Sequence, residues 1–154
     1  MAFLQIDYKS EALMRGVNIK VILPSDGMAG KWEPPYKTLY LLPGYSATAT
    51  ELITYLGLRG QSELKGIAIV LPDGENLFYQ DLPDRMTFYS TYVGKELVEV
   101  TRKMLPLSTK REDTFIGGIS MGGYGALYNG FKYRDTFSKV VAFSPAADAC
   151  MLLA

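Results

Sequence analysis

Ser120 lies in the pentapeptide Gly118-Ile119-Ser120-Met121-Gly122, which has the spacing G-x-S-x-G. This pattern is typical of a nucleophilic serine on a sharp turn between a strand and a helix, where side chains larger than glycine would collide at the flanking positions. Attack by such a serine on an acyl carbonyl forms an oxyanion, which backbone N–H groups can stabilise. The amide of Met121, at the start of the following helix, is the expected first donor. The pattern therefore predicts acyl transfer through Ser120.

The chain contains no histidine, although a serine hydroxyl is a weak nucleophile until a neighbouring base accepts its proton. Asp73, Asp81, Asp84 and Asp148 are candidate carboxylates. A lysine or tyrosine could also act as a base if burial lowered its pKa. Nothing in the spacing distinguishes one of these groups from the others. The sequence thus predicts a nucleophile without identifying its base.

Composition argues against several other classes of function. The 16 basic residues balance the 16 acidic ones and are dispersed along the chain, so we expect no nucleic-acid partner. No histidine and a single cysteine, Cys150, argue against zinc. Asp81 and Asp84 lack the ligand spacing of a known calcium loop, and no nucleotide-binding motif is present. We therefore expect neither a metal nor a cofactor.

The same features lead to an expectation about location. One cysteine cannot form an intrachain disulfide, which favours a reducing compartment, and Cys150 is expected to be a buried small apolar residue. The first seven residues lack the basic and apolar regions of a signal peptide. Apolar runs such as Ile67–Leu71 are too short to span a bilayer. The sequence therefore predicts a cytoplasmic protein with no membrane partner.

Short apolar runs alternate with helical patterns, which predicts a single α/β domain over residues 1–154 with a largely parallel sheet. Thr48 and Glu51 have the spacing of a capping box. The stretch 75–88 is irregular, and aromatic side chains between Tyr79 and Tyr92 are expected either to line a pocket or to cover the core. Strands are expected near residues 3–8, 17–23, 38–42, 66–71, 113–118 and 139–144, and helices near 48–58, 90–105 and 121–133.

Four segments carry a resemblance to a known family: Leu41-Leu42-Pro43-Gly44-Tyr45-Ser46, Leu71-Pro72-Asp73-Gly74, Phe78-Tyr79-Gln80-Asp81 and Gly117-Gly118-Ile119-Ser120-Met121-Gly122-Gly123-Tyr124-Gly125-Ala126. In this order they resemble the esterase D-like family of α/β-hydrolases, which includes tributyrin esterases, acetyl- and feruloyl-esterases and S-formylglutathione hydrolases. The resemblance covers nearly all of the chain, and the run S-M-G-G-x-G-A is its most specific part.

The resemblance implies roles for individual residues. Ser120 would be the nucleophile, Met121 and Tyr45 would supply the oxyanion-hole amides, and Gly118 and Gly122 would be the elbow glycines. The implied substrates are small carboxylic esters or thioesters with short acyl groups, and no cofactor is needed. The implied function is that of a serine carboxylesterase acting through an acyl-Ser120 intermediate.

The chain departs from the family pattern in two places. Family members commonly have His-Gly where this chain has Pro43-Gly44, which changes the local loop and removes one N–H group. In this fold the acid and the histidine follow the nucleophile, whereas this chain ends one expected strand past Ser120. The expectation is therefore a truncated α/β-hydrolase fold of about six strands that lacks the C-terminal strands carrying the acid and the histidine.

This expectation leaves the last strand, residues 139–144, at an exposed edge of the sheet. An exposed apolar edge strand invites pairing with another chain. We therefore expect a homodimer, or a separate complementing chain, through this edge. Two interpretations of function stay open: an esterase whose base comes from outside this chain, and a catalytically inactive fragment that acts as a binding or self-assembling module.

Overall fold

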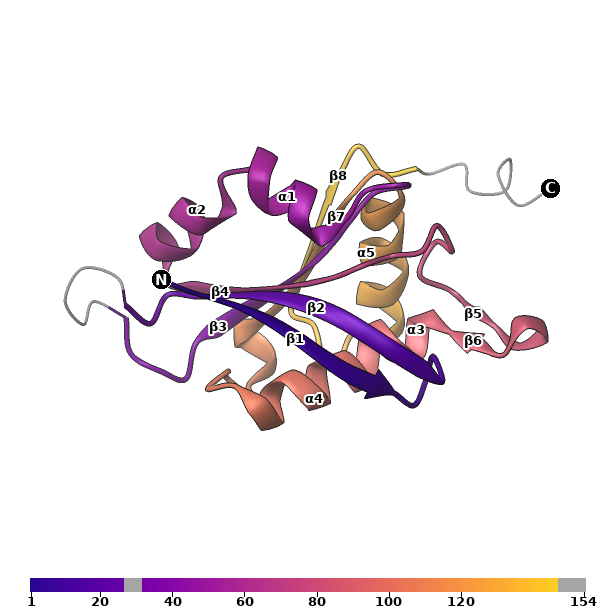
Figure 1. The fold of residues 1–154 in the computed structure, drawn as a ribbon, viewed down its shortest axis with the longest axis horizontal. Helices are drawn as coiled ribbons and strands as arrows, with labels where there is room; N and C mark the ends of the chain where they lie inside the picture. Colours follow the sequence, from indigo (N-terminus) through magenta and orange to yellow (C-terminus); the bar gives the residue numbers. More distant parts are fainter. Residues whose placement is uncertain (27–31, 147–154) are drawn as a thin grey trace.

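The computed structural model describes residues 1–26 and 32–146 of the chain. They form a six-stranded sheet with the strand order β1-β2-β4-β3-β7-β8 (Figure 1). The strands are β1 Ala2–Ser10, β2 Arg15–Leu23, β3 Lys37–Leu42, β4 Ile67–Pro72, β7 Thr114–Ile119 and β8 Lys139–Phe143. β4, β3, β7 and β8 are mutually parallel, whereas β1 and β2 pair antiparallel at one margin. The predicted mostly parallel sheet is confirmed.

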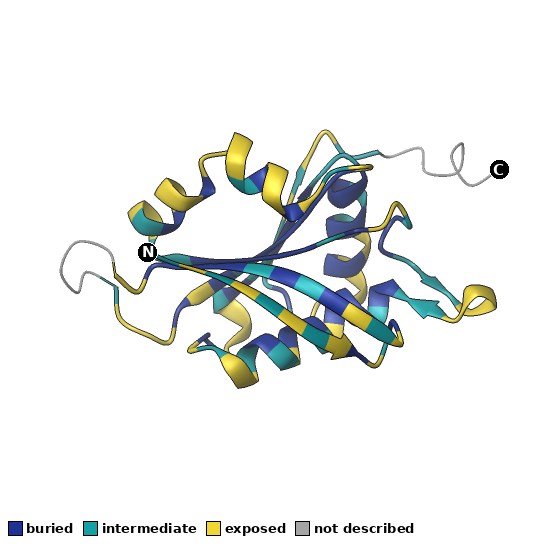
Figure 2. Ribbon diagram, viewed as in Figure 1, coloured by how far each residue is buried: buried dark blue, intermediate teal, exposed yellow. Residues whose placement is uncertain are grey.

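The burial of each strand follows its place in the sheet (Figure 2). β1 alternates half-buried and exposed residues, because one side of this edge strand faces solvent. β4 lies between β2 and β3, and every residue from Ala68 to Pro72 is buried. Its continuous apolar sequence is typical of a strand covered on both faces.

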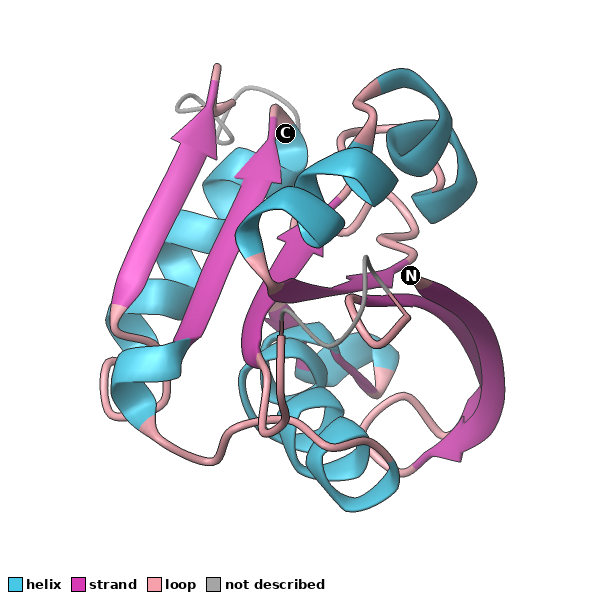
Figure 3. Ribbon diagram, turned by 90° about the vertical axis from the view of Figure 1, so that its left-hand side faces the viewer, coloured by secondary structure: helices cyan, strands magenta, loops and turns pink. Residues whose placement is uncertain are grey.

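Helices cover both faces of the sheet, but not equally (Figure 3). α5 (Met121–Lys132) packs against β3, β7 and β8, and next to it run α3 (Tyr89–Thr91), the π-helical turn η2 (Tyr92–Glu96) and α4 (Leu97–Met104). On the opposite face α1 (Ala49–Tyr55) and α2 (Leu58–Lys65) lie over β2 and β4. This second face is therefore open over β7 and β8 in the described part of the chain.

The expected helix over residues 48–58 is wrong in its length and continuity. α1 ends before Gly57, whose φ of 59° is left-handed, and the separate helix α2 begins directly after it. A left-handed glycine breaks the helical hydrogen-bond ladder, so the apolar spacing of one helix does not continue into the next. The capping box is confirmed, because Thr48 and Glu51 bond each other's backbone and side chain as expected.

The irregular stretch 75–88 contains a short hairpin that the sequence did not indicate. β5 (Asp81–Leu82) pairs antiparallel with β6 (Thr87–Phe88) around the 3-10 turn η1 (Pro83–Arg85). Strands of two residues are too short to produce an alternating apolar pattern. A second 3-10 turn, η3 (Arg111–Asp113), precedes β7.

Within residues 1–26 and 32–146, no helix is long and apolar enough to cross a membrane. The same residues contain no cluster of three or more His, Cys, Asp or Glu side chains arranged to hold a metal ion. The predictions for Asp148 and Cys150 concern residues outside the described part of the chain.

Candidate active site

Ser120 lies at the junction between β7 and α5, and its backbone has a conformation that residues other than glycine rarely adopt. Its φ is 54° and its ψ is −116°. The Ser120 amide donates to the carbonyl of Phe143 at 2.9 Å, and the Ser120 carbonyl accepts from the amides of Tyr124 and Ala146, each at 3.0 Å. These bonds hold the turn between α5 and the end of β8. Backbone strain at a single residue of this kind is characteristic of functional sites.

Gly118 and Gly122 allow this turn because their backbones touch other backbones. A Cβ on Gly118 would lie 2.0 Å from the carbonyl oxygen of Gly122. A Cβ on Gly122 would lie 2.0 Å from the carbonyl oxygen of Leu42, at the end of β3. No side chain fits at either position without moving the strand or the helix. The two glycines therefore place the start of α5 directly against β3.

The loop after β3, residues 43–46, lies beside Ser120 and is called the oxyanion loop below. A Cβ on Gly44 would lie 3.4 Å from the Cβ of Ser120. The amide of Ser46 donates to Asn76 at 2.6 Å, whereas the amides of Tyr45 and Met121 take part in no hydrogen bond among the described residues. One of these two free N–H groups directly follows the serine, and the other belongs to the loop that approaches it at Gly44. Their role as oxyanion donors stays a prediction.

The candidate carboxylates are engaged elsewhere or exposed. Among the described residues, the Ser120 hydroxyl forms no hydrogen bond with a titratable side chain. Asp73 accepts from the amide of Ala49 at 2.8 Å and thereby caps α1. Asp84 is exposed in the turn of the β5–β6 hairpin. The sequence spacing did not distinguish these carboxylates as candidate bases. In the structure, the carboxylate of Asp73 bonds the first residue of α1 and not Ser120.

Asp81 belongs to a network that fastens the β5–β6 hairpin to α5. Burial raises the pKa of Asp81, but hydrogen bonds from Thr91 and Lys132 outweigh this effect and lower the pKa below its usual value. The Nζ atom of Lys132 lies 3.1 Å from the Asp81 carboxylate and 2.8 Å from the Ser90 hydroxyl. A carboxylate of lowered pKa is a weaker proton acceptor, so this network acts in positioning rather than as a base.

The buried tyrosines are not activated as bases. Burial raises the pKa of Tyr8 and of Tyr40 to about 12. Burial also raises the pKa values of Tyr79, Tyr89 and Tyr92. A tyrosine can accept a proton only after it has lost its own, so these phenols remain protonated at neutral pH. The expectation of a base with lowered pKa is not met by these residues.

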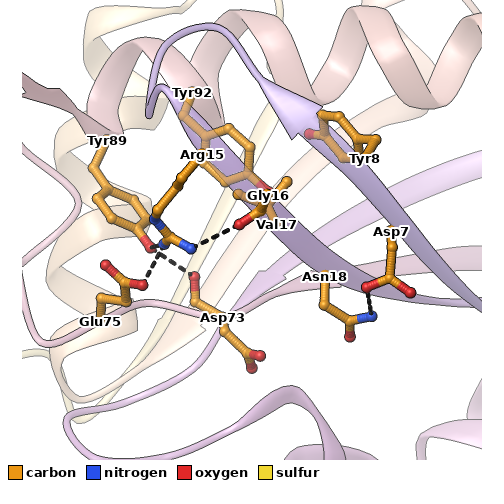
Figure 4. A pocket seen from close by; sticks show the side chains of 10 residues that line it. All are labelled: Asp7, Tyr8, Arg15, Gly16, Val17, Asn18, Asp73, Glu75, Tyr89 and Tyr92. Atoms are coloured by element: carbon orange, nitrogen blue, oxygen red, sulfur yellow. Dashed lines mark hydrogen bonds and ion pairs between the residues drawn. The ribbon is translucent and has the colours of Figure 1, made fainter.

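The aromatic residues between Tyr79 and Tyr92 mainly cover the core. Tyr79, Tyr89 and Tyr92 are all buried, and their rings meet edge to face. The last two also line a cavity of about 500 Å³ at the carboxyl end of β4 (Figure 4). In this cavity Arg15 forms an ion pair with Glu75 and donates to the Tyr89 hydroxyl at 3.0 Å. Ser120 does not line this cavity.

A second cavity, the apolar slot, lies between α2 and the uncovered face of the sheet. Its volume is about 470 Å³. The floor belongs to β3, β4, β7 and β8, and the wall belongs to α2 and to Leu56, the residue after α1. Apolar side chains dominate its lining, which includes Leu39, Leu41, Leu56, Leu58, Ile67, Ile69, Ile119 and Phe143.

A mostly parallel sheet with a strained serine at a strand–helix junction defines the class of α/β serine hydrolases. Comparison with solved structures agrees. The fluorophosphonate-binding serine hydrolase F of Staphylococcus aureus superposes with a TM-score of 0.89 and 30% identity, over 99% of this chain and 60% of that one. The S-formylglutathione hydrolase of the same organism gives 0.85 and 30%, over 98% of this chain and 60% of that one.

The Esterase family model matches residues 10–153, so the chain belongs to this esterase family. The acetyl esterase of Caldicellulosiruptor saccharolyticus is 40% identical over 151 residues, which are 95% of this chain and 57% of that protein. The S-formylglutathione hydrolase of Paracoccus denitrificans is 29% identical over 91% of this chain and 56% of that protein. The chain thus spans a little over half the length of these relatives.

Proposed function

We propose that this chain hydrolyses short-chain carboxylic esters or thioesters through an acyl-Ser120 intermediate, with a base supplied from outside the chain. The observation that carries the proposal is the strained Ser120, which the Met121 amide follows directly and which the loop carrying the Tyr45 amide approaches at Gly44; neither amide has a hydrogen-bond partner among the described residues. The relatives support the substrate class, because their names are those of an acetyl esterase and an S-formylglutathione hydrolase.

The proposed chemistry has two steps. The base takes the Ser120 proton while the oxygen attacks the carbonyl carbon, and the amides of Met121 and Tyr45 stabilise the oxyanion. Collapse breaks the bond to the alcohol or thiol, which leaves with the proton from the base. Water, deprotonated by the same base, then attacks the acyl-serine, the bond to the Ser120 oxygen breaks to release the acid, and the base returns its proton to that oxygen. No cofactor takes part in this proposal.

The β8 edge supports the proposed partner. Among the residues that the structure describes, β8 is the last strand of the sheet, and Val141 and Phe143 are 44% and 57% exposed on the face that α1 and α2 leave open. An unpaired apolar edge favours addition of a strand from a second copy or from a complementing chain. Such a chain, placed next to the carboxyl end of β8, would lie close to Ser120. We also propose a cytoplasmic location, which the single cysteine supports.

The first test supplies the base in solution. Purified protein is assayed with p-nitrophenyl acetate with and without imidazole, and Ser120→Ala is measured in parallel to subtract hydrolysis by imidazole itself. We expect imidazole to raise the Ser120-dependent rate about tenfold, less than the 10²–10⁴-fold of a positioned base. Mass spectrometry should find an acetyl group on Ser120. Equal rates for both proteins at every imidazole concentration would contradict the proposal.

A second candidate function is a catalytically inactive module that binds acyl compounds or assembles with other chains. Two observations favour it: the Ser120 hydroxyl has no base among the described residues, and the β8 edge carries exposed apolar side chains. This function predicts assembly that Ser120→Ala leaves unchanged, together with no Ser120-dependent turnover. The imidazole assay therefore distinguishes the two candidates.

A further inference from the structure

The segment that follows β4, residues 73–80, crosses the oxyanion loop and is called the brace loop below. The Tyr79 hydroxyl donates to the carbonyl of Pro43 at 2.8 Å. The Asn76 Oδ1 atom accepts from the amide of Ser46 at 2.6 Å. These two bonds hold the backbone on either side of Gly44 and Tyr45. The peptide between them, which carries the Tyr45 amide, has little freedom to rotate.

We propose that Tyr79 and Asn76 are positioning residues that orient the Tyr45 amide toward the oxyanion. The inference rests on the proposed function for the role of that amide, but the orientation itself can be tested separately. An oxyanion donor stabilises the transition state only if its N–H group points at the developing charge before the reaction. The Asn76 side chain and the Tyr79 hydroxyl bond the backbone of the oxyanion loop rather than Ser120, so their proposed role is exerted through that backbone.

Tyr79 is held tightly enough for this role. Its side chain has no exposed surface, and a Cβ on Gly74 or on Gly125 would lie 2.2 Å or 2.4 Å from it. The Tyr79 carbonyl accepts from the side-chain amide of Asn129, at 3.1 Å, on the buried side of α5. The Tyr79 hydroxyl is thus fixed relative to the helix that begins directly after Ser120.

The brace loop contains strain that its surroundings maintain. Glu75, Asn76, Phe78 and Tyr79 all have positive φ, between 47° and 57°. Non-glycine residues with positive φ cost free energy and persist only where other contacts determine the conformation. Asparagine tolerates this region better than most residues because its short polar side chain bonds nearby backbone. Asn76 therefore combines a tolerated conformation with the acceptor that the Ser46 amide needs.

The start of the brace loop, residues 73–75, is held against the first residue of β2 and against Tyr89. Arg15 forms an ion pair with Glu75 and also donates to the Tyr89 hydroxyl (Figure 4). The carbonyl of Asp73 accepts from the same hydroxyl at 3.4 Å. The loop is consequently fastened at its start by Arg15 and Tyr89 and near its end by Asn129. The two residues that bond the oxyanion loop, Asn76 and Tyr79, follow the first attachment.

Two matched pairs of variants test the proposal. Asn76→Asp keeps an acceptor oxygen and tolerates positive φ, whereas Asn76→Gly tolerates positive φ but removes the acceptor. Tyr79→Phe removes only the hydroxyl, and Tyr40→Phe is its control, because Tyr40 is equally buried but its hydroxyl bonds Thr101.

In the imidazole-supplemented assay, we expect Asn76→Gly and Tyr79→Phe to lower kcat about tenfold with KM unchanged. Asn76→Asp and Tyr40→Phe should keep kcat within about twofold of wild type. This split is expected because an oxyanion donor acts in the transition state.

The orientation of the Tyr45 amide can also be tested by a measurement that does not depend on catalysis. Amide hydrogen exchange and ¹⁵N–¹H spectra of the same proteins report on the Tyr45 and Ser46 amides directly. We expect Asn76→Gly and Tyr79→Phe to shift both resonances and to speed exchange of the Ser46 amide at least tenfold, while Asn76→Asp and Tyr40→Phe leave them close to wild type. Unchanged Tyr45 and Ser46 amides in Asn76→Gly and Tyr79→Phe would overturn the proposal. If wild type lacks Ser120-dependent turnover, the proposed function fails and the spectra alone decide the positioning.

Discussion

Ser120 has a backbone conformation that a residue other than glycine adopts only when its surroundings impose it. Its positive φ costs on the order of 1–3 kcal/mol. Hydrogen bonds at both its amide and its carbonyl, to Phe143, Tyr124 and Ala146, maintain that conformation. At the scale of the residue, the chain retains the strained geometry that a nucleophile needs, although no base lies beside it among the described residues.

The two elbow glycines make this geometry testable through stability. In Gly118→Ala and Gly122→Ala the new Cβ would lie 2.0 Å from a backbone oxygen, which cannot move away by changing a rotamer. We expect each variant to lower the free energy of unfolding by about 3 kcal/mol. In the control Gly60→Ala, on α2, the new Cβ meets no atom within 4 Å, so stability should rise by up to about 1 kcal/mol. Urea unfolding measures all three, and an equal change in the three variants would contradict the steric argument.

At the scale of elements, β8 and α2 both border the apolar slot. β8 is the edge of the sheet, and its residues alternate, with Lys139, Val141 and Phe143 exposed. α2 forms the wall of the apolar slot with its inner residues and turns Leu64 outward. The apolar surface of the slot thus reaches β8 through Phe143, which lines the slot and is also exposed on the edge strand, where Val141 is exposed as well.

This surface predicts self-association that one substitution should prevent. Val141→Lys places a charge on the edge strand, and charged residues are a common protection of sheet edges against pairing. We expect wild type to sediment as larger species as concentration rises, and Val141→Lys to remain monomeric. Leu64→Lys is the control, since this residue is exposed on α2 outside the slot lining. Wild type that stays monomeric at every concentration would contradict association of the chain with itself.

For the molecule as a whole, the two faces of the sheet differ in how completely they are covered. The face under α3, α4 and α5 contains the larger core, with the buried tyrosines Tyr40, Tyr79, Tyr89 and Tyr92. The face under α1 and α2 contains a smaller core, around Leu41, Ile69 and Leu71. Stability of the isolated chain should therefore depend mainly on the first face, where phenol groups are buried together with apolar side chains.

Burial of these phenols predicts a loss of stability in alkaline solution. Burial raises the pKa of Tyr8 and Tyr40 from 10.0 to about 12. Between about pH 10 and pH 12 the unfolded chain loses protons that the folded chain keeps, so the free energy of unfolding falls as pH rises. The expected slope is about 1.4 kcal/mol per pH unit for each such tyrosine. Urea unfolding between pH 10 and 12 should give a slope smaller by up to about one proton, near pH 11, in Tyr40→Phe. The same slope in both proteins would contradict this account.

Several features of the site could be predicted from the sequence because they are local. The G-x-S-x-G spacing requires a tight strand–helix turn whatever the rest of the chain does, and Gly118 and Gly122 each touch backbone within the site. The six strands were also predictable, since each consists of a short apolar run within a few residues. The helix boundary at Gly57 and the short β5–β6 hairpin were not, because neither produces a periodic pattern.

The sequence by itself predicted Ser120 as the nucleophile, predicted the class of fold and showed the absence of histidine. Only the tertiary structure decided that Asp73 caps α1, that the described residues leave the face over β7 and β8 open, and that Asn76 and Tyr79 bond the oxyanion loop. Asn76 and Tyr79 bond residues 30 and 36 positions away in the chain. Such contacts depend on how strands order in the sheet and how one loop crosses another. Residue type and spacing describe the chain only over a few positions, so they carry no record of these long-range contacts.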